Sequence, residues 1–332
     1  MSRACRSMLL ASGLALALVV APMAPRAQDD TGPLRFSAGG VTGLYFALSS
    51  SFCRLLWPDL AERLKRCDVA SSQGSVSNLR LVRAGAADLG IAQADLVPLA
   101  VAGTESFTRD GPNPNLRVLF STVLEKLTIV IAPNSGIESL DDMLGRSVDF
   151  GPPGSGSLAT AVRFLDDVGH SLDDFHPVSS TTSALNPQQL CNGEIDAFAF
   201  IAAHPNGVLQ EAMATCGARL LPGRSEVMNA FTEKFPEYHL TEIDAGLYPQ
   251  IDYDVSTFGV PAIVIADARL PEEVAYRLTK TVFENLEALH RLQLAFVDLT
   301  VEDLLRPCAG APYHPGALRY FREAGYPTPV CE

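Results

Sequence analysis

Glycine, proline and serine cluster at Gly151–Ser157, in the order G-P-P-G-S-G-S, between a short apolar run and a helical pattern. Such a turn exposes several backbone N–H groups at the positive end of the following helix dipole, which favours an anion. The hydroxyls of Ser155 and Ser157 can cap the helix or hydrogen-bond a ligand. The stretch therefore predicts an anion site, although a helix start without any ligand has the same pattern.

A nucleotide-binding loop is a more specific alternative function for this stretch. A Walker A loop requires a lysine and then a hydroxyl residue after its second glycine. Gly151 and Gly156 have the required spacing, but Ser157 and Leu158 stand at the lysine and hydroxyl positions. Without these groups the terminal phosphates and Mg²⁺ each lose a partner, so we do not expect a nucleotide here.

Two earlier stretches, Ala38–Gly43 and Ser71–Ser75, repeat the same chemistry. Each places glycine and hydroxyl residues between a predicted strand and a predicted helix. Thr42 and Tyr45 are candidates at the first turn, although an aromatic residue there can equally serve the core. Three such turns facing one cleft would bind a carboxylate without a buried cation.

The elements that must position these turns have an α/β pattern. Helical patterns alternate with short apolar runs, as expected for strands that cross over through helices. A mature chain of about 300 residues suggests two domains. Phe52 and Trp57 are assigned to the core. The apolar runs are Leu34–Phe36, Leu89–Ala92, Val118–Phe120, Thr128–Ala132, Val148–Phe150, Ala197–Ala202 and Val260–Ala266.

A weak similarity between two segments of the chain supports two similarly built lobes. Gly85–Asp88 and Gly193–Asp196 both end a helical pattern and lead into a buried run, although a simple turn explains each. Ligands of open α/β sheets lie beyond the carboxyl ends of the strands, where Gln93, Asp95 and His204 would stand. A lone histidine such as His204 is more often a surface or hydrogen-bonded structural residue than a ligand contact.

The N-terminal segment Met1–Ala27 has the features of a secretory signal. Arg3 and Arg6 precede the apolar run Met8–Val20, which is too short to span a membrane comfortably. We therefore expect cleavage near Ala27 and a periplasmic mature protein. The net charge of −13 argues against nucleic acid or an anionic membrane as a partner.

Cysteine usage agrees with an oxidising compartment. Cys5 lies in the predicted signal, and the remaining cysteines allow many pairings. There is no C-x-x-C or H-E-x-x-H motif, so neither a metal site nor a cofactor is predicted. Nearest-neighbour pairing is our expectation, and it joins Cys53 to Cys67, Cys191 to Cys216 and Cys308 to Cys331.

Several short motifs resemble those of the TAXI family of solute-binding proteins, and they occur in the same order along the chain. TAXI proteins are the extracytoplasmic receptors of one class of TRAP (tripartite ATP-independent periplasmic) transporters. The similarity covers about Leu34 to Tyr326, nearly the whole mature chain. The matching elements are Gly39–Phe46, Gly74–Leu81, Ala87–Gln93, the N-L-R near Asn115, Ser135–Asp142, Gly151–Gly156, Gly193–Phe198, Ala245–Pro249, Gly259–Ala262 and Tyr313–Ala317.

The resemblance implies a two-lobed periplasmic-binding-protein fold with two crossover segments. Lobe I would comprise residues 33–125 plus 258–332, and lobe II residues 126–257. A monomer would capture a small anionic solute (an amino acid, keto acid or dicarboxylate) and deliver it to an ion-gradient-driven TRAP permease. The ligand-facing residues carried over are Thr42, Gly43, Tyr45, Ser75, Gln93, Ser155, Gly156, Ser157 and Tyr248.

One departure concerns His204, which stands where the family has a tyrosine in G-Y-P, so an imidazole replaces a phenol. Two alternative functions are compatible with parts of the sequence. A sensing partner of a membrane receptor would have the same features. An exported hydrolase is less favoured, because the chain has no G-x-S-x-G elbow, zinc motif or Ser-x-x-Lys, although 38 acidic residues leave a glycosidase-type carboxylate pair open. We therefore expect a binding protein and not an enzyme.

Overall fold

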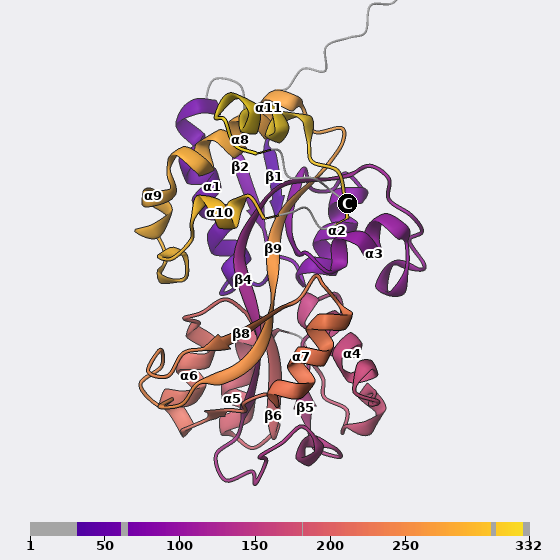
Figure 1. The fold of residues 1–332 in the computed structure, drawn as a ribbon, viewed down its shortest axis with the longest axis vertical. Coiled ribbons are helices and arrows are strands. Elements are labelled where there is room, and N and C mark those ends of the chain that lie inside the picture. The colour runs from indigo at the N-terminus through magenta and orange to yellow at the C-terminus, as the bar shows by residue number, and fades with distance from the viewer. Residues whose placement is uncertain (1–31, 61–65, 181, 307–309, 328–332) are drawn as a thin grey trace, which may run out of the picture.

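Within the part of the chain that the structure describes, nine strands form one mixed sheet that runs through two lobes (Figure 1). This computed structural model describes residues 32–60, 66–180, 182–306 and 310–327. The predicted signal at Met1–Ala27 lies outside the described residues. The strand order is β2-β1-β3-β9-β4-β6-β5, with β7 beside β4 and β8 beside β9.

The strands are short except for two. They are β1 Leu34–Ser37, β2 Cys67–Ala70, β3 Leu89–Gln93, β4 Leu116–Ile131, β5 Val148–Asp149, β6 Ala197–Ala202, β7 Arg219–Leu220, β8 His239–Ile243 and β9 Val255–Asp267.

The two long strands, β4 and β9, connect the lobes. They pair antiparallel, and Figure 1 shows both running from the upper lobe into the lower one. Their register shifts between Val118 and Phe120 and again between Ser121 and Leu124. The predicted lobe boundaries fall inside these strands, and the assignment of residues to lobes stays a prediction. The predicted two-lobed α/β fold with two crossover segments is confirmed.

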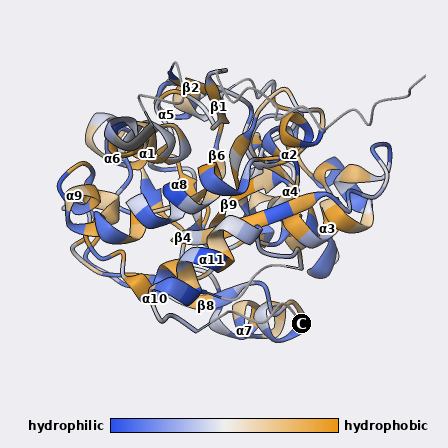
Figure 2. Cartoon of the chain, turned by 90° about the horizontal axis from the view of Figure 1, so that it is seen from above, coloured by the Kyte–Doolittle hydropathy of each residue, from blue (hydrophilic) through white to orange (hydrophobic). Residues whose placement is uncertain are grey.

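Helices cover the sheet in both lobes, with α4 to α7 in the lower one (Figure 1). Figure 2 shows hydrophilic and hydrophobic residues alternating along them, as expected for helices that bury one face. The α-helices are α1 Leu44–Leu60, α2 Ser75–Arg83, α3 Leu96–Ala102, α4 Gly156–Asp167, α5 Asn186–Cys191, α6 Gly207–Cys216, α7 Ser225–Lys234, α8 Glu272–Glu284, α9 Leu286–His290, α10 Val301–Leu304 and α11 Pro315–Glu323. The 3₁₀ helices are η1 Glu105–Phe107, η2 Asp141–Met143, η3 Leu172–Asp174, η4 Ser183–Leu185 and η5 Leu294–Phe296.

The buried face of α1 illustrates how the helices pack. Leu48, Phe52 and Leu56 recur every four residues and are buried, so they lie on one face. Phe52 packs edge-on to Phe120 of β4, which confirms its place in the core. The assignment of Trp57 to the core is wrong, because it is 43% exposed. It follows Leu56 by one position, which turns its side chain away from the buried face.

Two predicted disulfides are confirmed. Cys53 of α1 bonds to Cys67 of β2, and Cys191 of α5 bonds to Cys216 of α6. The third predicted pair, Cys308 with Cys331, lies outside the described residues.

Candidate ligand cleft between the lobes

A cavity of about 120 Å³ is bordered by the first residues of helices from both lobes. The starts of α1, α2 and α4 all contribute, as the three glycine-and-hydroxyl turns predict. The start of α6 is a fourth border, through Asn206 and Val208. The sequence-predicted residues that line the cavity are Thr42, Gly43, Tyr45, Ser75, Gln93, Ser155, Gly156 and Ser157.

The starts of α2 and α4 are in direct contact across the cleft. The Ser77 amide donates to the Gly154 carbonyl at 3.1 Å. Gly154 has a φ of +93°, in the left-handed region that favours glycine. At Gly156 the reason for glycine is space, because a Cβ there would lie 1.4 Å from Oε1 of Gln93. Glycine therefore lets the two helix starts approach closely.

The hydroxyls of α4 have structural partners, whereas its first amides do not. Ser155 Oγ caps the helix by accepting from the Leu158 amide at 3.1 Å, and Ser157 Oγ accepts from the Ile201 amide at 3.1 Å. Among the described residues, no acceptor is found for the amides of Gly156 and Ser157. These N–H groups, at the positive end of α4, are suited to carboxylate oxygens.

A chain of polar side chains crosses the cleft beside these amides. The Tyr45 hydroxyl donates to Oε2 of Glu125 at 2.5 Å and lies 3.5 Å from Ser75 Oγ. Ser75 Oγ accepts from the Gln93 amide at 3.2 Å. The Gln93 side chain then donates from Nε2 to Oγ1 of Thr160 on α4, at 3.0 Å. Groups from both predicted lobes therefore share one hydrogen-bond network.

Two buried carboxyl groups belong to this network. Asp95 Oδ2 accepts from the Thr160 hydroxyl at 3.2 Å and from the Tyr238 hydroxyl at 2.6 Å. Burial raises the pKa of Asp95 to about 6, against the opposing effect of the Tyr238 hydrogen bond. Burial also raises the pKa of Glu125 to about 8, and the charge of Asp95 adds to that rise.

Glu125 is the acidic residue of the described lining, and it is one of several lining residues that the sequence-based interpretation missed. It stands in the middle of β4, a position where a strand buried on both faces normally carries an apolar residue. The available signal was an acidic residue in the stretch that joins two apolar runs into one strand. It was hidden because those runs were taken as separate strands, and because Ser121, Thr122 and Lys126 make the stretch between them polar.

Tyr248 and His204 do not line this cavity; they lie behind its wall. Tyr248 is fully buried, and its hydroxyl accepts from the Asn206 amide at 2.9 Å and lies 2.7 Å from His204 Nδ1. The hydroxyl therefore donates to Nδ1, which leaves the proton on Nε2 to donate to Thr128 Oγ1 at 3.0 Å. Burial, and then the charge of Lys126, lower the pKa of His204 to about 3, so it is neutral at neutral pH.

An ion-pair cluster at α4 joins the two predicted lobes. Arg163 of α4 lies 2.7 Å from a carboxylate oxygen of Glu105 on η1 and 2.6 Å from one of Glu237. Glu105 belongs to predicted lobe I and the other two residues to predicted lobe II. The described chain is therefore in a form in which the lobes touch.

The family of the chain follows from comparison with known proteins. A model of the NMT1-like family matches residues 36–325, almost all of the described residues. The chain belongs to the NMT1-like family. The glycine-rich helix starts and β4 of this NMT1-like protein all lie within the matched region.

Solved structures show the same fold at low sequence identity. A protein of Bordetella bronchiseptica RB50 matches with a TM-score of 0.55 and 13% identity, covering 89% of this chain and 99% of its own. The periplasmic binding protein BugD matches at 0.53 and 13%, covering 89% and 98%. PhnD1 from Prochlorococcus marinus, in complex with methylphosphonate, matches at 0.50 and 14%, covering 80% and 90%. These likenesses support a shared fold with two-lobed periplasmic binding proteins.

The described residues include no helix that is long and apolar enough to cross a membrane. They also hold no group of three or more His, Cys, Asp and Glu side chains arranged to bind a metal ion.

Proposed function

We propose that this NMT1-like protein is an extracytoplasmic receptor that binds a small carboxylate-bearing solute in the cleft and delivers it to an ion-gradient-driven TRAP permease. The observation that carries the proposal is the convergence of the α1, α2 and α4 starts on one small cavity. Its described lining includes no lysine or arginine, so backbone amides and neutral side-chain donors are the available partners for a carboxylate.

Binding without turnover is part of the proposal. Ser155 and Ser157 are the obvious nucleophile candidates, but their oxygens accept structural hydrogen bonds from backbone amides. Neither has a base as a hydrogen-bond partner among the described residues. A hydrolase needs such a nucleophile–base pair.

Lobe closure would couple binding to delivery. The Ser77–Gly154 hydrogen bond, the Gln93–Thr160 hydrogen bond and the Arg163–Glu105 ion pair all join the predicted lobes. These contacts would break when the cleft opens, and a bound solute would favour their formation by bridging both walls. A permease that recognises both lobes at once would then select the loaded form.

The first test is a thermal-shift panel of amino acids, keto acids and dicarboxylates on the purified mature protein, followed by calorimetry. A true ligand at 100 times its Kd should stabilise the fold by about 2.7 kcal/mol. If no compound in the panel shifts the melting temperature, the solute-binding proposal is wrong.

Delivery to a permease is tested in proteoliposomes that contain the candidate TRAP permease. Uptake of the ligand should require both the receptor and an ion gradient. Uptake that needs ATP, or no uptake with tight binding, would exclude the TRAP assignment and leave the receptor function standing.

A further inference from the structure

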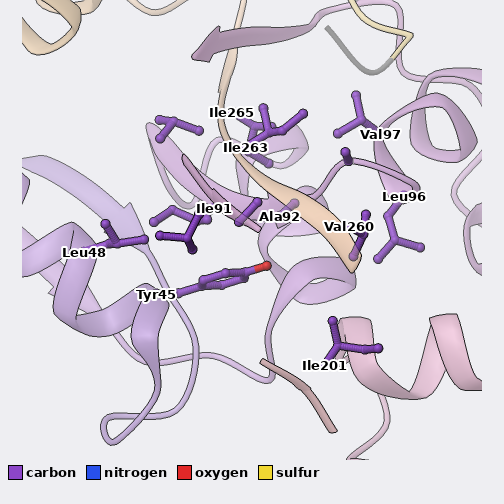
Figure 3. Close-up of a cluster of buried hydrophobic side chains, with 14 of the residues drawn as sticks. Tyr45, Leu48, Ile91, Ala92, Leu96, Val97, Ile201, Val260, Ile263 and Ile265 are labelled. Atoms are coloured by element: carbon purple, nitrogen blue, oxygen red, sulfur yellow. The ribbon is translucent and has the colours of Figure 1, made fainter. Parts of the chain in front are cut away.

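Glu125 presents a carboxyl group to the cavity. Its side chain lines the cavity although the residue is only 6% exposed. Oε2 accepts from Tyr45, whereas no partner of Oε1 is found among the described residues. Figure 3 shows the Tyr45 ring among apolar side chains, with its hydroxyl oxygen directed away from α1. One oxygen of Glu125 is therefore fixed and the other is available.

No cation of the described lining compensates this carboxyl group. The titratable groups that act on it are Tyr45, through a hydrogen bond, and Asp95, through its charge. Because burial holds the pKa of Glu125 near 8, about nine-tenths of the empty protein carries a proton there at pH 7. An acidic side chain in this setting lacks a positive partner, which a ligand can supply.

The amide donors lie on the other side of the same small space. The Tyr45 hydroxyl contacts both Glu125 Oε2, at 2.5 Å, and Ser75 Oγ, at 3.5 Å. Ser75 begins α2, whose start meets that of α4 across the cleft. A molecule of a few heavy atoms can therefore reach the helix amides with one end and Glu125 with the other.

We infer that the cleft selects a solute that carries an ammonium group beside its carboxylate, as an α-amino acid does, and that Glu125 is the residue that selects it. The inference rests on the proposed function and narrows its solute class. The ligand carboxylate takes the amides of α2 and α4, and the ammonium donates to Oε1 of Glu125. A dicarboxylate instead brings a second negative charge toward this residue.

Charge balance gives the inference a measurable signature. To pair with an ammonium, Glu125 must ionise, so its proton leaves for the solvent as the ligand binds. A fall in the pKa of Glu125 from about 8 to below 6 on binding releases about 0.8–0.9 proton per site at pH 7. Below pH 8 the affinity should rise with pH, by about six- to eightfold between pH 6.5 and 7.5.

The experiment is calorimetry of the mature protein with alanine, glutamate, pyruvate, 2-oxoglutarate and succinate, in phosphate and in Tris. Tris and phosphate differ in ionisation enthalpy, so the difference in apparent enthalpy counts the protons. We expect an amino acid to bind most tightly with proton release. Glu125→Gln should weaken that binding at least about 100-fold and abolish the release. Its melting curve and its affinity for keto acids report that it is folded.

Asp95→Asn is the matched control, because Asp95 is the other buried carboxyl of the network. It should keep most of the proton release that Glu125→Gln loses, because burial is the main cause of the raised pKa of Glu125 and the charge of Asp95 only adds to it. If a keto acid or dicarboxylate binds as tightly as any amino acid, without proton release and equally in Glu125→Gln, the selectivity inference is overturned and the receptor function remains. If nothing binds to the wild type, the proposed function itself fails, and this inference fails with it.

Discussion

Gly156→Ala is the substitution that tests the contact between the two helix starts most directly. The new Cβ would lie 1.4 Å from Oε1 of Gln93 and 2.7 Å from Oγ of Ser75, so the Gln93 side chain must move. Gln93 is buried and donates to Thr160 at 3.0 Å, and that bond would be lost with the movement. Overpacking costs about 1–3 kcal/mol and the lost buried hydrogen bond about 1 kcal/mol more.

The expected consequence appears mainly in binding. Gly156 and Gln93 belong to opposite predicted lobes, so opening the cleft relieves the clash without unfolding either lobe. We therefore expect solute affinity to fall by about 30-fold to 1000-fold, the equivalent of about 2–4 kcal/mol. The melting temperature of the empty protein should fall much less than this cost implies. Small-angle scattering should report a larger radius of gyration in the presence of solute than for the wild type.

Gly207→Ala is the matched control. Gly207 begins α6 as Gly156 begins α4, but a Cβ there meets no atom within 4 Å. This variant should bind and melt like the wild type. Wild-type affinity in Gly156→Ala would refute the reasoning, because it would mean that the α4 start and Gln93 do not meet in the loaded form.

Three further predictions concern stability. Ser155→Ala should lower the free energy of unfolding by about 0.5–2 kcal/mol in urea titrations, because it removes the cap on the Leu158 amide; an unchanged midpoint would deny the cap. Replacing Cys191 and Cys216 together by serine should cost about 2–4 kcal/mol in the same assay, and thiol titration of the unfolded, unreduced wild type should find neither thiol free. The Glu125 contribution to the free energy of unfolding of the empty protein should fall by a few kcal/mol as pH rises from about 4.5 to 8, because the folded chain keeps the proton that the unfolded chain has released. It is measured as the difference between the wild type and Glu125→Gln, since His204, whose pKa is lowered, and Asp95, whose pKa is raised, also change the profile of both proteins; a difference that rises with pH would contradict the raised pKa.

The strands differ in how far the sequence could predict them. Runs such as Ala197–Ala202 are continuous apolar segments and match β6 residue for residue. The partly exposed edge strands β2 and β8 were missed, since they have little apolar signal. The runs Val118–Phe120 and Thr128–Ala132 are parts of one strand, β4, whose middle carries buried polar residues. Thr122, for example, donates to the carbonyl of Ala262 on β9 at 2.9 Å.

The residues of the candidate site also differ in how far the sequence could predict them. Helix starts are local features, so glycine and hydroxyl residues placed the turns at α1, α2 and α4 correctly along the chain. Whether a residue lines the cavity or is buried behind the lining depends on the tertiary fold. The sequence pattern therefore could not distinguish Tyr248 and His204 from lining residues. Glu125 required knowing that β4 passes through the cleft. Among 38 acidic residues, composition alone does not single it out.

The pairing of β4 with β9 constrains how the cleft can work. Two paired strands resist shear and twist between the lobes that they join. The shifts in register near Val118 and Ser121 interrupt the hydrogen bonds between β4 and β9, and the pair should bend more easily there. We therefore expect the lobes to rotate relative to each other about one axis near these two strands. The opposing walls would return to the same alignment at every closure, so a selective pocket can be rebuilt in each cycle without a search among misaligned arrangements.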